Sequence, residues 1–253
     1  MPTTRGHKLN HASLDARNFD KVLGNAGLEG VDRTAHPWGG ARAARQELQK
    51  TVGNLHEARA AIMRDSTRTE AERHRLMGDA VDKAYHHVSR RLSGAEESLR
   101  RHARQADANI EAVFNERMPS EASEIRTYVR GLNGRAERLD FLHTAIKNGD
   151  IETAAAVLSA RPYLSGLDDK MAGTVRKEAE RVAAPSDVKA RDAALEGADE
   201  IVNAMRLFDV ETGDMADMRE AQRAKEEREK SEAAIRQATS PTHVDPEETE
   251  ATG

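Results

Sequence analysis

Residues 70–117 read EAERHRLMGDAVDKAYHHVSRRLSGAEESLRRHARQADANIEAVFNER, and this stretch decides the fold. Its apolar and small residues recur every three or four positions, which is the spacing of one face of an α-helix. They are Met77, Val81, Ala84, Val88, Leu92, Ala95, Leu99, Ala103, Ala106, Ile110 and Val113. No proline interrupts the chain between Pro37 and Pro119, so one very long helix can form.

A helix over 70–117 would be about 72 Å long, at a rise of about 1.5 Å per residue. A compact globule of this chain length would be only about 46 Å across, from its expected radius of gyration. Aromatic residues make up 3% of the 253 residues and charged residues 33%, so large side chains for a thick core are scarce. We therefore predict an all-α, elongated protein of antiparallel, coiled-coil-like helices that bury thin apolar seams.

The stretch just upstream has a similar seam. Between residues 41 and 64 the apolar positions are Leu48, Val52, Leu55 and Ile62, at heptad-like spacing. Residues 65–69 read DSTRT, which is rich in residues that cap helices and form turns. Residues 41–118 are thus expected to form either one long helix or a helical hairpin.

The rest of the chain divides by composition into four segments. Residues 1–40, with six glycines, are predicted to form an irregular and flexible N-terminal arm. Residues 119–213 contain several helical stripes separated by Pro and Gly, and predict a helical bundle segment. Residues 214–238 predict a helix that is polar on nearly all faces, and 239–253 predict a disordered acidic tail.

Charge and composition limit the class of protein. Residues 1–118 carry 20 Lys+Arg against 16 Asp+Glu, whereas residues 119–253 carry 19 against 28. Such asymmetry suits head-to-tail packing or an anionic partner at one end, although charges on solvated helix faces would also produce it. There is no cysteine, no secretion signal and no run of about 18 apolar residues. We expect a soluble protein without membrane contact.

No motif indicates catalysis or a cofactor. The sequence contains no nucleophile elbow, phosphate-binding loop, dinucleotide fingerprint or zinc-protease motif. The adjacent His86 and His87 would diverge by about 100° on a helix, which is unfavourable for a shared metal. We therefore predict no catalytic residues, no metal site and no cofactor, and expect that the protein is not an enzyme.

The seam of 70–117 is the first candidate for contact with a partner. Val88, Leu92, Leu99 and Ile110 are predicted to pack against a second copy of the chain or another structural protein. Trp38, in the sequence His36-Pro37-Trp38-Gly39-Gly40, is read as a loop residue and as a candidate anchor for a neighbour. The alternative for Trp38 is that it covers the end of its own helix pair.

A basic stretch over 83–104 indicates a second class of function. Among its cations are Arg90, Arg91, Arg100, Arg101 and Arg104. A helix bearing these side chains could lie along the phosphates of a nucleic acid, with affinity that falls steeply with salt. Glu96 and Glu97 interrupt the stretch, and the alternative is a solvated helix surface.

A weak family likeness covers residues 140–200. The stretch from Leu142 through Arg161-Pro162-Tyr163-Leu164-Ser165-Gly166-Leu167, which leads into two polar helices, resembles small helical proteins of unassigned role encoded among tailed-bacteriophage structural genes. That resemblance transfers no site residue, but it implies a virion or assembly context, with the protein in the virion or in the cytoplasm of a bacterial host. The sequence thus predicts a non-enzymatic structural or assembly protein, with nucleic-acid association as the alternative.

Overall fold

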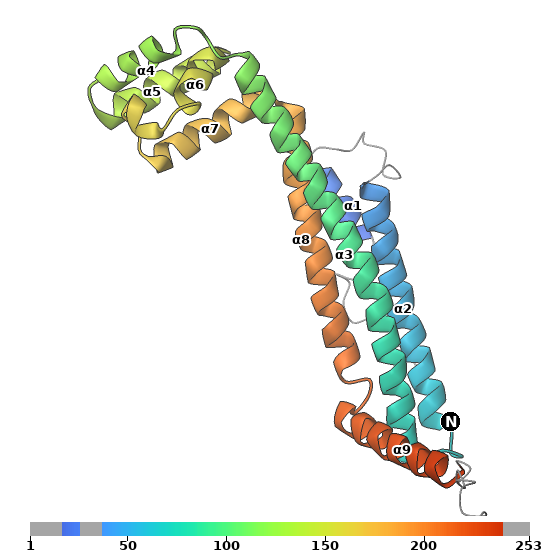
Figure 1. The fold of residues 1–253 in the computed structure, drawn as a ribbon. Helices are drawn as coiled ribbons and strands as arrows, with labels where there is room; N and C mark the ends of the chain where they lie inside the picture. The colour runs from blue at the N-terminus through green and yellow to red at the C-terminus, as the bar shows by residue number, and fades with distance from the viewer. Residues whose placement is uncertain (1–16, 26–36, 240–253) are drawn as a thin grey trace, which may run out of the picture. The chain divides into compact units, whose positions relative to one another are not determined.

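The computed structural model describes residues 17–25 and 37–239, which are helical apart from short connections (Figure 1). In chain order the elements are α1 (Arg17–Asn25), α2 (Trp38–Arg64), α3 (Glu70–Glu116), α4 (Ala122–Gly131), α5 (Gly134–Lys147), α6 (Ile151–Leu158), the 3-10 turn η2 (Pro162–Ser165), α7 (Asp169–Ala183), α8 (Pro185–Gly213) and α9 (Met218–Thr239). Over these two ranges there is no strand. The predicted all-α class with long antiparallel helices is confirmed.

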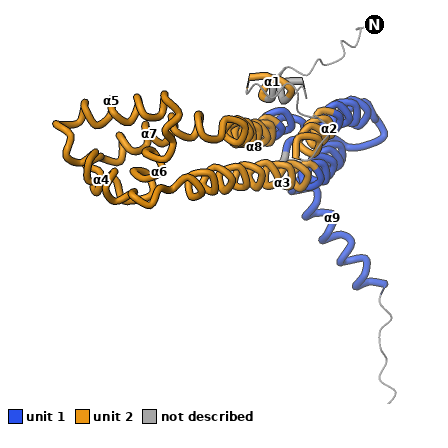
Figure 2. Tube along the Cα trace, turned by 90° about the horizontal axis from the view of Figure 1, so that it is seen from above, with its two compact units in different colours: residues 1–8, 50–87, 208–253 blue, residues 9–49, 88–207 orange. Residues whose placement is uncertain are grey.

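The chain forms two compact units, coloured separately in Figure 2. Unit 1 comprises residues 1–8, 50–87 and 208–253, and unit 2 comprises residues 9–49 and 88–207. The long helices α2, α3 and α8 contribute residues to both units, and each unit is described below by itself. The five-segment division expected from composition stays a prediction.

Parts of the predicted arm and tail lie outside the described residues, namely 1–16, 26–36 and 240–253. Within the range of the arm, α1 is described, and so is the start of α2. The interpretation of Trp38 as a loop residue was wrong, because Trp38 is the first residue of α2. Pro37 directly precedes this helix, and its carbonyl accepts a hydrogen bond from the Ala41 N–H at 3.1 Å.

In unit 1, a turn at residues 65–69 separates α2 from α3 and reverses the chain. The Asp65 carboxylate accepts hydrogen bonds from the Thr67 N–H at 3.0 Å and from Arg68 Nε at 2.8 Å. The Thr69 hydroxyl caps α3 by accepting the Glu72 N–H at 3.2 Å. Arg73 reaches back from α3 to the Met63 carbonyl of α2 at 3.1 Å. Of the two arrangements left open by the sequence, the structure has the hairpin.

In unit 2, helices α4, α5, α6 and α7 pack with η2 into a cluster, hereafter the α4–α7 cluster (Figure 1). Its buried core is shared with the end of α3 and the start of α8, and consists of Ile110, Phe114, Val129, Leu142, Ile146, Ile151, Ala154, Ala155, Val157, Leu167, Met171, Val175, Ala179, Ala184 and Val188. Helix α6 is the centre of the cluster, because six of its eight residues are buried. Small alanines allow its neighbours to approach closely.

Two helices of the cluster begin at aspartate caps. Asp150 accepts the Thr153 N–H at 3.0 Å at the start of α6, and Asp168 accepts the Met171 N–H at 2.8 Å at the start of α7. A break separates α4 from α5, since α4 ends at Gly131 and α5 begins at Gly134. Gly134 has φ +86, a left-handed conformation that side chains disfavour, and this explains the break.

We predict that Asp150→Ala lowers the free energy of unfolding by about 1 kcal/mol, because two orphan hydrogen-bonding groups of Thr153 lose their acceptor. Chemical denaturation followed by circular dichroism measures this change. Asp140→Ala is the matched control, because Asp140 is an exposed aspartate in the body of α5. Equal stability of the two variants would contradict the cap assignment.

We predict that the Asp65 carboxyl titrates below the ordinary aspartate value of about 3.9. The hydroxyl of Thr67 donates to this carboxylate and is the largest cause of its lowered pKa. Because the folded pKa is depressed, the stabilisation of the turn is present above the unfolded value and is lost as pH falls through the folded pKa. Carboxyl carbon NMR shifts measured against pH test this, and Thr67→Val should return the pKa of Asp65 toward its ordinary value. An unshifted wild-type titration would refute the assignment.

Candidate interaction surfaces

The seam predicted for partner contact lies inside unit 2. Val88, Leu92, Leu99 and Ile110 are at most 1% exposed, so they belong to the chain's own core. The periodicity therefore identified buried positions correctly. A partner could reach these side chains only if unit 2 opened, so their role toward a partner stays a prediction and is not used below.

Trp38 is also buried, with 4% of its surface exposed. Its ring meets His102 of α3 edge-on, with ring centroids 5.8 Å apart and planes at 80°. Both residues belong to unit 2. This geometry corresponds to the alternative stated for Trp38, in which the indole covers its own helix pair, and it leaves little surface for a neighbour.

The basic stretch of α3 is partly neutralised. Arg100 Nε lies 2.8 Å from Glu96 and its Nη2 lies 3.4 Å from Asp199, and the hydrogen bond with Glu96 is the main reason that the pKa of Arg100 is raised. Arg101 pairs with Glu97 at 3.0 Å. The charge available for phosphates is thus reduced.

Three arginines of this stretch are different. Arg90, Arg91 and Arg104 are exposed and form no ion pair with any described residue. Of the five arginines predicted to contact nucleic acid, only these three have no carboxylate partner among the described residues.

Helix α8 has apolar side chains on two faces. Ala194, Ala198 and Ile201 are buried in unit 2, whereas Leu195 and Val202 are 40% and 48% exposed. The sequence analysis did not separate these faces. Adjacent residues such as Ile201 and Val202 diverge by about 100° on a helix, and this spacing was the signal that could have distinguished them.

A cluster of ion pairs joins α3, α7 and α8 within unit 2. Glu180 is buried and accepts hydrogen bonds from Arg176 Nε at 2.9 Å and from Arg191 Nη1 at 2.7 Å. Arg191 also contacts Asp107 at 3.3 Å and Asp192 at 3.0 Å. Burial opposes the charge of Arg191, yet its pKa is raised because the hydrogen bonds that it donates to Glu180 and Asp192 outweigh that cost. The polar groups here are satisfied by one another, and this suits a structural role.

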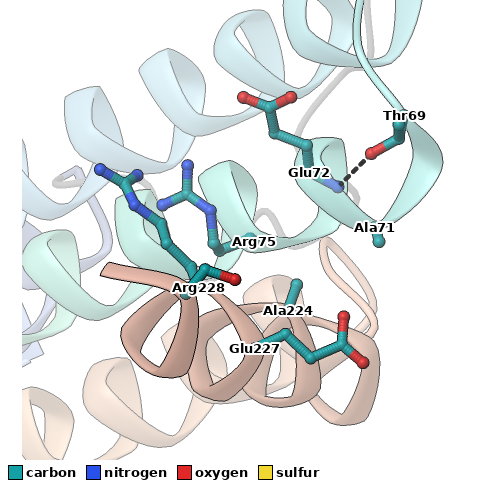
Figure 3. Close-up of a pocket in the computed structure, with 8 residues that line it drawn as sticks. Thr69, Ala71, Glu72, Arg75, Ala224, Glu227 and Arg228 are labelled. Atoms are coloured by element: carbon teal, nitrogen blue, oxygen red, sulfur yellow. Dashed lines mark hydrogen bonds between the residues drawn. The ribbon is translucent and has the colours of Figure 1, made fainter. Parts of the chain in front are cut away.

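In unit 1, α3 and α9 border a groove of about 420 Å³ (Figure 3). Its lining residues are Thr69, Ala71, Glu72, Arg75, Ala224, Glu227, Arg228 and Ser231. Arg75 pairs with Asp79 at 3.0 Å, and Arg228 pairs with Glu232 at 2.6 Å. Both guanidinium groups therefore already have carboxylate partners, and the groove shows no clear preference for an ion of either sign.

Among the described residues, no three His, Asp or Glu side chains come together in a way that could hold a metal ion. Within the same ranges, every helix is too short or too polar to span a bilayer.

Comparisons with known proteins give no assignment. No family model matches the sequence, no curated protein matches it, and no solved structure matches its fold.

We predict that Glu180→Gln lowers the free energy of unfolding by about 3 kcal/mol, because it removes the buried partner of two arginines. Asp192→Asn is the matched control, since it removes an exposed carboxylate from the same Arg191 and should cost less than about 1 kcal/mol. Urea unfolding of both variants measures the difference. Similar costs for the two would show that burial of Glu180 adds nothing.

Proposed function

We propose that this protein is a non-enzymatic structural or assembly protein that acts through helix–helix contacts, with a second copy of itself or with another structural protein. The observation that carries the proposal is the exposed pair Leu195 and Val202 on α8. They are seven residues apart, so they lie on one stripe of the helix, at the spacing used by helix–helix seams.

The buried face of α8 supports this interpretation. Ala194, Ala198 and Ile201 fill the core of unit 2, so the outward stripe is not needed for the chain's own packing. A helix that is apolar on two sides is typical of a helix with partners on two sides. Asp199 lies on the same stripe, between Leu195 and Val202, and its carboxylate pairs with Arg100 at 3.4 Å.

The setting that we propose is a bacteriophage particle or its assembly. Its support is the resemblance of residues 140–200 to helical proteins encoded among phage structural genes. Mass spectrometry of purified particles and assembly intermediates from the source system tests the setting. Absence of the chain from both would reject it.

We predict that the double variant Leu195→Glu and Val202→Glu shifts self-assembly toward the monomer mass of 27.8 kDa, because carboxylates would be forced into an apolar contact. Size exclusion with light scattering measures the mass over a range of concentrations. Val182→Glu is the matched control, since Val182 is a similarly exposed valine on α7 of the same unit.

The control variant should retain the mass of the unmodified protein. A wild-type protein that stays monomeric at all concentrations would reject self-association through this stripe. Equal loss of assembly in the control would reject the assignment to Leu195 and Val202.

A further inference from the structure

A concentration of uncompensated positive charge lies where α4 packs against η2 and α6 in the α4–α7 cluster. Residues 125–136 read IRTYVRGLNGRA and residues 153–167 read TAAAVLSARPYLSGL. Together the two segments contain Arg126, Arg130, Arg135 and Arg161 but no Asp or Glu. On α4, Glu124 lies about 200° around the helix from Arg126, so it faces away.

Apart from Arg135, the arginines here have main-chain partners or none. Arg126 Nη1 donates to the Ala156 carbonyl in the last turn of α6 at 2.9 Å. Arg138 of α5 donates to the carbonyls of Gly166, Arg130 and Leu132 at 2.9, 3.1 and 3.1 Å. Carbonyl partners orient a guanidinium without neutralising it, so the positive charge of both arginines remains.

Two further arginines are exposed. Arg130 and Arg161 form neither an ion pair nor a side-chain hydrogen bond within the described part of the chain. Of the four arginines in the two segments, Arg135 alone has a carboxylate partner there, Asp168 at 3.1 Å.

An aromatic ring is exposed on η2, the segment that follows Arg161. Tyr163 is 60% exposed and lies two residues after Arg161 in the chain. The segment is held in a defined turn, because the Leu164 N–H donates to the Arg161 carbonyl at 2.9 Å and the Leu167 N–H donates to the Pro162 carbonyl at 3.0 Å. Gly166, with φ +70, closes the turn. The ring is therefore presented by ordered backbone.

We propose that Arg126, Arg130, Arg161 and Tyr163, hereafter the α4–η2 basic surface, bind single-stranded nucleic acid. The guanidinium groups contact phosphates, and the Tyr163 ring stacks on a base. Guanidinium groups beside an exposed ring are the combination used by proteins that bind single strands without sequence preference. An acidic peptide would be attracted by the arginines but would gain little from the flat ring.

The surface is separate from the stripe on α8 and from the basic stretch of α3. Arg100 and Arg101 of that stretch are paired with carboxylates, whereas Arg130 and Arg161 are not. The inference goes beyond the proposed assembly function. The Leu195→Glu and Val202→Glu variant should still bind nucleic acid. The proposed assembly function and the proposed nucleic-acid binding can therefore be rejected independently of each other.

Fluorescence anisotropy of the full chain with a labelled oligothymidine of about 12 nucleotides tests the proposal. The double variant Arg130→Gln and Arg161→Gln should weaken binding at least tenfold. It should also reduce the slope of log affinity against log salt by about 1.4, since two phosphate contacts are lost. Neither side chain supports the fold, so circular dichroism should be unchanged.

The double variant Lys177→Gln and Arg181→Gln is the matched control. It removes the same charge from two exposed cations of α7, which contributes no residue to the α4–η2 basic surface, and should change affinity less than about twofold. If it weakens binding as much as the change at Arg130 and Arg161, or if the unmodified protein does not bind at low salt, the proposal is overturned.

Tyr163→Leu tests the stacking contact. It should weaken binding at least fivefold while leaving the salt dependence unchanged, because stacking involves no counterion release. An abasic oligonucleotide of the same length should bind the unmodified protein as weakly as oligothymidine binds the Tyr163→Leu variant. Equal binding of oligothymidine, abasic strand and polyglutamate would show a general site for anions and overturn the assignment to nucleic acid.

Discussion

The burial of narrow, alanine-rich stripes between long helices is the constraint on which the rest of this structure depends. Ala95, Ala103 and Ala106 line the buried face of α3, and Ala193, Ala194, Ala198 and Ala204 line that of α8. Small side chains let helix backbones approach closely, so the layer of apolar side chains between two helices is thin. With so few aromatic residues, the core must extend along the helices, and polar side chains then lie close to it on both sides.

Buried charge follows from this thin core. Arg45 of α2 has no exposed surface and donates to Glu200 of α8 at 3.1 Å, in unit 2. Glu180 is held in a similar way between α7 and α8. A buried pair adds little net stability compared with apolar packing, but misplacing one partner is costly. We infer that these pairs select one helix register, which alanine stripes alone would leave weakly defined.

The regular spacing of apolar residues made the long helices predictable from the sequence. The partners of individual side chains were not predictable in this way. The seam of α3 could be identified from local sequence, and residues 65–69 were recognised as a candidate turn, because each depends on residues close in the chain. The division between α4 and α5 depended on the left-handed conformation of Gly134, which spacing does not reveal. Arg100 pairs with Asp199 of α8, about a hundred residues away, and the segments that carry Arg126 and Arg161 are neighbours only because α4 packs against η2. Such contacts arise from tertiary structure, which no single helical pattern encodes.

The path of the chain through the α4–α7 cluster has an evolutionary consequence. The chain leaves the end of α3 to form the cluster and returns at the start of α8, where Asn109 Nδ2 donates to Asp187 Oδ1 at 2.9 Å. Entry and exit are therefore neighbours, which is the geometry of a module inserted into a pre-existing hairpin. A gene encoding this protein could lengthen, shorten or exchange the segment between Met118 and Ala184 while the pairing of α3 with α8 persists. Ile110, Phe114 and Val188, which project into the cluster, are the positions that would have to change with it.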